Sequence, residues 1–403
     1  MRIYDSSRFT HHVSRFTNDV IIIGGGVIGA ATAYYLSKRN IKTILVEKND
    51  LASGTSGACD GCIFMQSKKP GRHLELALQS AKLYQTLPDE LDCDIGYKKS
   101  GGMILIESEE QLATMRQFTQ QQQNAGLEVE LLGIEDALKI ERHLSPQLVG
   151  ATYSPMDAQV DPLSLTFAFA AAAKRLGAQI LTDTEVTSIA VKNGKAEGVQ
   201  TNSGKIAAEI IINAAGVYAP FIGMMVGVEI PIIPRRGQIL VTEPLPPLIN
   251  CIMLCACYIA AKFKVDWQEG KKARGQEGKV DSHLTDDSQL GVGTVLEQHH
   301  ASNILLGSTR EFVGYDRRVT IEGMRAIAHH AKNILPILSN VHIIRSFAGL
   351  RPYTSDGLPF LGYIGGPEGF LVAAGHEGDG IALAPITGKL LADCVEKRNQ
   401  TLL

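Results

Sequence analysis

Residues 20–46 read VIIIGGGVIGAATAYYLSKRNIKTILV, and this stretch sets the architecture at the amino end of the chain. The β-branched run Val20–Ile23 predicts a buried parallel strand, and Thr43–Val46 predicts a second one. Val27–Arg39 has the composition of a helix. Between the first strand and this helix, Gly24–Gly29 fits the pattern G-x-G-x-x-G. The sequence therefore predicts a βαβ unit, as in a Rossmann-like fold.

The glycine pattern has a physical use in binding a dinucleotide. The first glycine permits the turn, the second leaves room for a pyrophosphate, and the third lets the helix pack on the strand. The start of the helix adds N–H donors and partial positive charge. Glu47, after the second strand, is placed to bind ribose hydroxyls. The glycine pattern alone also fits a tight turn without a ligand. Strand, glycine motif, helix, second strand and Glu47 in this order predict an unphosphorylated adenine dinucleotide, either FAD or NAD.

Two further segments favour a flavin. Ala52–Ala58 (ASGTSGA) offers small and hydroxyl residues that allow backbone and Oγ groups to bond a pyrophosphate. Gly375–Ile381 (GHEGDGI) precedes a predicted helix, whose start can stabilise negative charge on a reduced flavin ring. An NAD enzyme has no use for this second glycine-rich helix start. Each segment alone is also compatible with an ordinary loop.

Composition and charge exclude several classes of protein. The formal net charge is −3 without a run of five like charges, which argues against nucleic acid or an anionic membrane as a partner. The longest apolar stretch, 248–261, is too short to span a bilayer, which takes about 20 residues. Residues 1–18 resemble a polar arm rather than a secretory signal. Seven cysteines, an odd number, favour a reducing compartment, and we expect a cytoplasmic protein.

The remaining pattern predicts an α/β protein of two interleaved domains. After the N-terminal arm, we expect a Rossmann-like FAD-binding domain from 19–90, 150–230 and 345–403, and a mixed β-sheet (α+β) substrate domain from 91–149 and 231–344. Lys262–His283 is expected as an exposed loop. The other expected elements are helices at His73–Leu87, Glu109–Asn124, Pro162–Leu176 and Gly380–Glu396, a hairpin of Ile180–Val191 and Ala196–Thr201 turning at Asn193-Gly194, and strands at Glu209–Asn213 and Phe370–Ala374.

Several motifs resemble those of the D-amino-acid oxidase superfamily of FAD enzymes, in particular its glycine oxidase and sarcosine oxidase branch. The resemblance runs from Val20 to about Val395, and its most specific pieces are Ala214–Tyr218 (AAGVY), Cys257–Lys262 (CYIAAK), Ala348–Pro352 (AGLRP) with Asp356–Pro359 (DGLP), and Ala374–His376 (AGH).

Within that superfamily, Ser53–Gly61, its continuation Gln66–Gly71, and Gly307–Gly314 (GSTREFVG) are more discriminating. They look like the flavin subunits of multi-subunit amine dehydrogenases, a group that includes opine oxidases, cyanide-forming glycine dehydrogenase and dye-linked proline and D-hydroxyproline dehydrogenases. The resemblance implies partner subunits that carry further flavin or iron–sulfur centres.

The resemblance also implies the chemistry and its residues. A small amino acid, imino acid or opine would lose a hydride from the carbon next to nitrogen to N5 of non-covalently bound FAD, giving an imine. Arg351 and the Tyr258 hydroxyl would bind the substrate carboxylate, with His376 near the ring. Glycine oxidase has an arginine where Gly378 stands here, so substrate contacts at that point must differ. The residues expected to bind the cofactor are Gly24, Gly26, Val27, Ile28, Gly29, Glu47, Lys48, Thr55, Ser56, Asp60, Gly61, Val186, Ala214, Gly216, His376, Gly378, Asp379, Gly380 and Ile381.

Alternatives remain open from the sequence. Arg351 and His376 also fit structural roles, no general base is assigned, and the role of Asp60 is undecided. The whole chain also fits an NAD-linked dehydrogenase, or a non-catalytic FAD subunit that relays electrons or supports assembly.

The cysteines raise the question of a metal site. Cys59-x-x-Cys62 lies in the predicted loop near the flavin, and Cys251, Cys255 and Cys257 are expected in one strand as small core residues. We therefore expect no metal.

Overall fold

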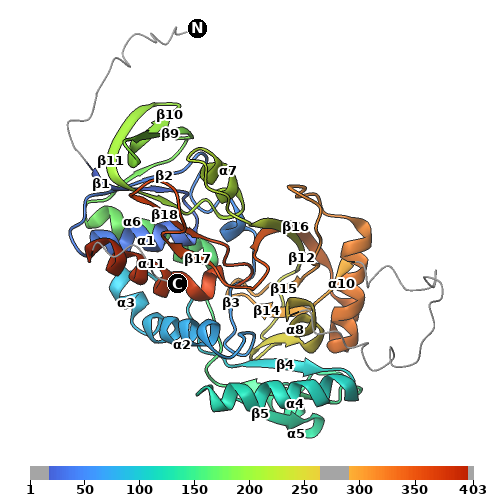
Figure 1. Ribbon diagram of the computed structural model, residues 1–403. Helices are drawn as coiled ribbons and strands as arrows, with labels where there is room; N and C mark the ends of the chain where they lie inside the picture. The colour runs from blue at the N-terminus through green and yellow to red at the C-terminus, as the bar shows by residue number, and fades with distance from the viewer. Residues whose placement is uncertain (1–17, 264–289, 398–403) are drawn as a thin grey trace, which may run out of the picture.

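The computed structural model describes residues 18–263 and 290–397, and two large sheets organise them (Figure 1). The first sheet has the order β17-β18-β11-β1-β2-β8, and its five strands from β18 to β8 are parallel. A hairpin of β9 and β10 continues from β11. The strands are β1 (Asn18–Ile23), β2 (Thr43–Val46), β8 (Gln179–Leu181), β9 (Val186–Lys192), β10 (Lys195–Thr201), β11 (Gly204–Asn213), β17 (Phe360–Gly362) and β18 (Phe370–Ala374).

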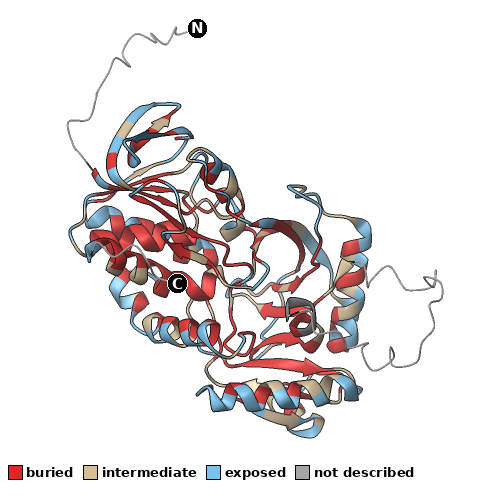
Figure 2. Ribbon diagram, viewed as in Figure 1, coloured by how far each residue is buried: buried red, intermediate tan, exposed pale blue. Residues whose placement is uncertain are grey.

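The first sheet is buried on both faces, as a parallel sheet requires. Val20 and Ile22 of β1 pack into one core, and Ile21 and Ile23 pack into another on the opposite face. Helices cover the first of these faces, and Figure 2 shows α1 and α11 almost entirely buried. The helices of this part are α1 (Val27–Ser37), α2 (Arg72–Tyr84), α3 (Leu87–Leu91), α6 (Pro162–Arg175), α7 (Ala219–Met224) and α11 (Gly380–Glu396), with short 3₁₀ turns η2 (Thr55–Gly57) and η3 (Gly216–Tyr218).

The second sheet is mixed and has the order β16-β12-β15-β14-β13-β4-β6-β5. Its pairs are antiparallel except β13 with β4. Helices α4 and α10 pack on it and turn their exposed faces outward (Figure 2). Its elements are β4 (Gly102–Ile106), α4 (Glu109–Asn124), β5 (Glu130–Gly133), α5 (Ile134–Ile140), β6 (Gly150–Ser154), β12 (Ile233–Thr242), β13 (Ile252–Cys255), α8 (Ala256–Phe263), β14 (Val295–Gln298), β15 (Ile304–Gly307), α10 (Ile321–Ile334), η5 (Pro336–Asn340) and β16 (Ile343–Tyr353); β3 (Cys62–Ile63) and β7 (Ala158–Gln159) form a separate ribbon.

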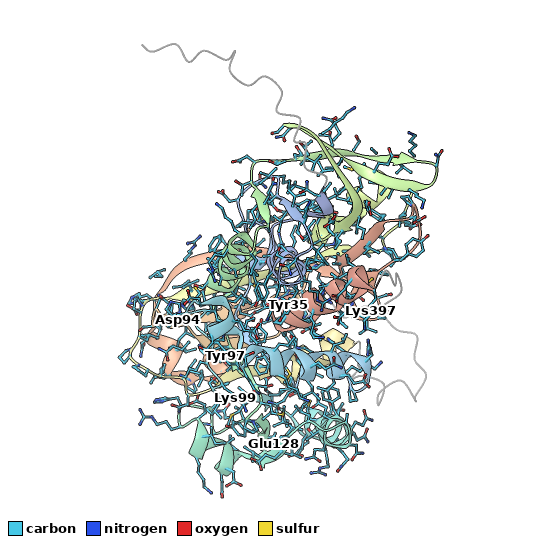
Figure 3. The ribbon with its side chains drawn as sticks, turned by 90° about the vertical axis from the view of Figure 1, so that its left-hand side faces the viewer. Tyr35, Asp94, Tyr97, Lys99, Glu128 and Lys397 are labelled. Carbon is cyan, nitrogen blue, oxygen red and sulfur yellow. A yellow bond between two sulfur atoms is a disulfide. The ribbon has the colours of Figure 1, made fainter. Side chains whose placement is uncertain are left out.

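The two parts are joined by several passages of the chain. In Figure 3, Tyr35 marks α1 of the first part. Tyr97 and Lys99 mark one connecting segment, between α3 and β4, and Glu128 lies just before β5 in the second part. The edge strand β16 contacts both η2 and η3. Thr55 donates a hydrogen bond from Oγ1 to the carbonyl oxygen of Leu350 at 2.6 Å. The strand that carries Arg351 is therefore held directly against the loop that follows β2.

Most predicted elements are confirmed, with small shifts at several ends and larger differences in two. The helix expected over His73–Leu87 ends at Tyr84, and a new helix, α3, begins at Leu87 with Pro88 in its first turn, where proline is tolerated. The strand expected over Ile180–Val191 is also divided. Its first part joins the parallel sheet as β8, and its second part enters the hairpin as β9, with Asp183 at φ +50° between them.

The prediction that Cys251, Cys255 and Cys257 share a strand is wrong. β13 ends at Cys255, and α8 begins at the next residue. The partner strand β4 ends one residue after the position that pairs with Cys255, so a longer β13 would have no neighbour on that side. The loop predicted over Lys262–His283 falls mainly outside the described residues. In the described part of the chain, no helix is long and apolar enough to cross a membrane.

Candidate functional site

A cavity of about 380 Å³ runs from the carboxyl ends of β1 and β2 to the edge of the second sheet. Ligands of open α/β sheets bind at this end of the strands. Of the predicted cofactor and catalytic residues, Gly29, Gly61 and Asp379 do not line this cavity. The lining ones are Gly24, Gly26, Val27, Ile28, Glu47, Lys48, Thr55, Ser56, Asp60, Val186, Ala214, Gly216, Tyr258, Arg351, His376, Gly378, Gly380 and Ile381.

The turn between β1 and α1 is shaped for close approach of a ligand. Gly24 has φ +116°, which side-chain-bearing residues rarely adopt. A Cβ atom at Gly29 would lie 1.9 Å from the Gly24 carbonyl oxygen, so this glycine lets the helix pack against the turn. Gly26 caps α1 without a side-chain hydrogen bond, and the Val27 N–H donates to Ser56 Oγ at 3.0 Å. The helix start thus faces the cavity with little side-chain cover.

Glu47 fixes the turn as well as facing the cavity. Its Oε2 accepts from the Gly25 N–H at 2.7 Å, and its Oε1 accepts from the Asn49 N–H at 2.9 Å. Each carboxylate oxygen can accept a second hydrogen bond, so Glu47 could also bind the two hydroxyl groups of a ribose. These groups, the bare helix start and the glycine turn fit the adenosine and pyrophosphate of a dinucleotide.

Arg351 lies at the other end of the cavity, across the face of β12. Its Nη1 donates to the carbonyl oxygen of Thr309 at 3.1 Å, and its Nη2 donates to Ser308 Oγ. Both acceptors are neutral, so this guanidinium keeps its charge available for an anion. A Cβ atom at Gly237 would lie 2.3 Å from Nη1 of Arg351. Gly237 therefore makes room for the arginine.

Two more arginines stand beside Arg351. Arg235 lies directly opposite it in the pairing of β12 with β16, and Arg310 is almost fully buried. Glu377 forms an ion pair with Arg235 and lies 3.5 Å from Nη1 of Arg310. Burial, followed by repulsion from Arg310 and Arg351, lowers the pKa of Arg235 to about 9. Three guanidinium groups lie together here, and among the described residues the one carboxylate between them, Glu377, pairs only with Arg235 and Arg310, so this end of the cavity is attractive to an acidic ligand.

Tyr258 is positioned by this cluster. The guanidinium carbon of Arg310 lies 3.7 Å from the centre of the Tyr258 ring, a cation–π contact. A Cβ atom at Gly378 would lie 3.2 Å from the Tyr258 hydroxyl and 3.6 Å from Arg351, which places these three residues together. The glycine keeps open the space between the tyrosine and the arginine.

The helix start at α11 completes the cavity wall. His376 is buried, its Nε2 lies 3.0 Å from Thr387 Oγ1, and burial lowers its pKa to about 3. It is therefore a neutral residue within the fold. Asp379, which precedes α11, pairs with Lys68 at 2.8 Å and with His73 at 3.0 Å, and it lines a small second cavity.

Sequence reasoning missed a buried carboxyl group that contacts the loop before β3. Glu297 of β14 accepts hydrogen bonds at Oε2 from the Gly61 N–H at 2.7 Å and from Cys62 Sγ at 3.3 Å. Burial, then the nearby Asp60, raises the pKa of Glu297 to about 7. A Cβ atom at Gly61 would lie 1.8 Å from the Val160 carbonyl oxygen. A glycine is therefore needed here for the backbone to pack against Val160, and Gly61 does not line the cavity.

The sequence held partial signals for the other missed residues. Ser308 and Arg310 belong to the motif 307–314, which carried the resemblance without an assigned role. Glu377 lies within the motif 375–381, to which the sequence analysis assigned no role for this residue, and Gly237 and Arg235 had no signal that separated them from ordinary strand residues. Their importance follows from contacts between segments more than 100 residues apart, Arg235 with Glu377 and Gly237 with Arg351.

Known proteins are similar to this chain in sequence and in fold. Residues 19–394 match the family described as FAD dependent oxidoreductase (DAO). Glycine oxidase of Geobacillus kaustophilus is 32% identical, over 94% of this chain and 93% of that protein. Hydrogen cyanide synthase subunit HcnC of Pseudomonas aeruginosa is 30% identical, over 96% and 94%. The structure of L-proline dehydrogenase from P. horikoshii superposes with a TM-score of 0.82 at 27% identity, covering 96% of this chain and 95% of that one.

Proposed function

Because this chain belongs to the FAD-dependent oxidoreductase family, we propose that it oxidises the C–N bond of a small amino acid, imino acid or opine to an imine. The family decides between FAD and NAD in favour of FAD. The observation that carries the proposed substrate class is Arg351, whose guanidinium lies in the cavity wall with only neutral hydrogen-bond acceptors among the described residues. A substrate carboxylate would supply the negative charge that this guanidinium lacks among its described neighbours.

The protein's own part in this reaction is to bind and orient the substrate. Arg351 would hold one carboxylate by a two-point, charge-assisted contact, and the Tyr258 hydroxyl would donate to the same group. This anchoring aligns the adjacent C–H bond, and orientation of this kind lowers the barrier substantially. FAD, when bound, supplies the hydride acceptor. His376 would support the cavity wall as a neutral residue.

We also propose how the cofactor and partners are arranged. The three segments 19–90, 150–230 and 345–403 would form the FAD-binding domain, and 91–149 with 231–344 the substrate domain, with the FAD held non-covalently. The similarity to HcnC, which is named as a subunit, supports partner subunits that accept the electrons. The cytoplasmic location stays a prediction.

Anaerobic flavin bleaching tests the proposal. The purified holoenzyme is mixed with glycine, sarcosine, L-proline, D-proline, hydroxyproline or an opine, and the oxidised flavin absorbance is followed. At least one compound should reduce the flavin. Arg351→Ala should keep its flavin but slow that reduction by about 30-fold or more, because a lost buried charge pair costs about 2–5 kcal/mol.

Arg345→Ala is the matched control, since Arg345 is exposed on the same strand β16. It should reduce its flavin at the unaltered rate. Reduction by none of the compounds, or equal rates in Arg351→Ala and Arg345→Ala, would refute the proposed function.

A further inference from the structure

A second group of chemically reactive side chains lies apart from the cofactor cavity. Glu107, Cys255, Cys257 and His330 each point one ligand atom to the same place, and these four atoms lie within 4.8 Å of one another. They come from three separate parts of the second sheet: the end of β4, the junction of β13 with α8, and α10. Figure 1 shows α8 beside β14 and α10. None of the four lines the cofactor cavity.

The hydrogen bonds in this group orient the imidazole toward its centre. His330 Nδ1 lies 2.6 Å from Thr294 Oγ1, and His330 Nε2 lies 2.9 Å from Glu107 Oε2. Without an ion, a proton is shared between Nε2 and Glu107; with an ion, Nε2 becomes a ligand and a proton on Nδ1 donates to Thr294. A second-sphere contact of this kind is what metal-binding histidines make through their other nitrogen. A cation between Nε2 and Glu107 would take the place of the shared proton.

Glu107 supplies an independent sign of a missing positive partner. Its Oε1 is buried and, within the described residues, accepts no hydrogen bond. A buried carboxylate oxygen without a partner is costly, and a metal ion satisfies it directly.

The two cysteines are joined as a disulfide in the structure, so the ion requires their reduced form. A dithiol reductant delivers two electrons and two protons to Cys255 and Cys257 and closes into its own disulfide. Binding of a divalent ion then releases those two protons and leaves two thiolates. The disulfide and the metal are alternative states of one site.

We propose that Glu107, reduced Cys255, reduced Cys257 and His330 form a four-ligand Zn²⁺ site. Two thiolates, one imidazole and one carboxylate are ligands that Zn²⁺ accepts, and four protein ligands are typical of a structural rather than a catalytic site. The ion would tie together β4, α10 and the first turn of α8. Because Tyr258 follows Cys257 directly, the site would also hold the helix that brings Tyr258 to the cofactor cavity.

Metal content and cobalt spectroscopy of the full chain test the site. The holoprotein is reduced with dithiothreitol under anaerobic conditions, incubated with Zn²⁺ and desalted, and zinc is measured by mass spectrometry. About one zinc per chain is expected, falling to near zero in Cys257→Ser and in His330→Gln. Cys93→Ser is the matched control, since Cys93 is an exposed free cysteine, and it should keep its zinc.

Co²⁺ replaces Zn²⁺ in a parallel sample to report the ligands. Tetrahedral Co²⁺ gives d–d bands to the red of the oxidised flavin, and thiolate ligation adds charge-transfer absorption. Both should appear in the wild type and Cys93→Ser, and both should be lost in Cys257→Ser. Circular dichroism and flavin content verify that each variant is folded. The site is overturned if the reduced wild type retains no zinc and shows no cobalt bands, or if folded Cys257→Ser and His330→Gln retain as much metal as the wild type.

Discussion

Replacing Glu297 with glutamine should stabilise the protein at alkaline pH and much less at acidic pH. The carboxyl group is buried beneath Gly61, and its pKa rises from 4.5 to about 7 on folding. A raised carboxyl pKa means that the folded state binds the proton more tightly than the unfolded state. The contribution to stability is therefore full below pH 4.5 and is lost as the pH rises through 7.

The size of the effect follows from the pKa change. The shift is about 2.5 pH units, and each unit corresponds to about 1.4 kcal/mol, so ionised Glu297 costs about 3 kcal/mol at pH 8. At pH 5 the same cost is below about 1 kcal/mol, because the carboxyl is protonated in the fold. Glutamine keeps the shape and never ionises. The stability gained by Glu297→Gln should thus be greater at pH 8 than at pH 5 by about 2.5 kcal/mol.

Urea unfolding with excess FAD, followed by circular dichroism, measures this difference. Comparing the two pH values cancels any pH-independent cost of the substitution. Glu128→Gln is the control, since Glu128 is exposed and its replacement should have the same small effect at both pH values. The reasoning fails if Glu297→Gln changes the free energy of unfolding equally at pH 5 and pH 8.

Three further predictions concern the cofactor cavity and its walls. Burial lowers the pKa of His376 to about 3, so between pH 7 and pH 5 only the unfolded state gains a proton on this residue, and the fold loses stability. His376→Gln should reduce that loss by about 2 kcal/mol. Urea unfolding at the two pH values measures it, and an equal loss of stability in the variant and the wild type would contradict it. Gly378→Ala places a Cβ atom 3.2 Å from the Tyr258 hydroxyl, and overpacking of this kind costs about 1–3 kcal/mol. KM for the reducing substrate should therefore rise about fivefold or more in steady-state assays. An unchanged KM would mean that the substrate does not use this space. Gly29→Ala places a Cβ atom 1.9 Å from a backbone carbonyl oxygen and should lower the flavin content of the purified protein, whereas Gly133→Ala, with no atom within 4 Å, should not; equal flavin content in both would argue against the tight turn.

Much of the cofactor half could be predicted because its signals are local. The strand, glycine turn, helix and second strand over residues 20–46 occur where the spacing places them, and α4, β18 and α11 have the predicted ends. Residues of the motif Gly375–Ile381 line the same cavity as residues of Gly24–Gly29, although about 350 residues separate the two motifs. A parallel sheet explains this, since its strands end at one edge whatever their order in the chain.

The errors have equally physical origins. Cys257 was expected on a strand, but β13 ends at Cys255, one residue before its neighbour β4 ends, and the next residues form α8. Strand length depends on available partners, and a single segment does not reveal them. The break between β8 and β9 has the same cause, since each part pairs with a different strand.

The sequence by itself determined the βαβ start and a dinucleotide site, because spacing and residue type encode these features within short segments. Its resemblance to a known family supplied Arg351 and Tyr258 as candidates and favoured FAD over NAD. Only the tertiary structure decided that Gly237 makes room for Arg351, that Glu297 sits under Gly61, and that Glu107 and His330 meet the cysteines of α8. These contacts join residues far apart in the chain, and their geometry depends on how the two sheets fold and pack. Short sequence patterns do not encode such long-range contacts.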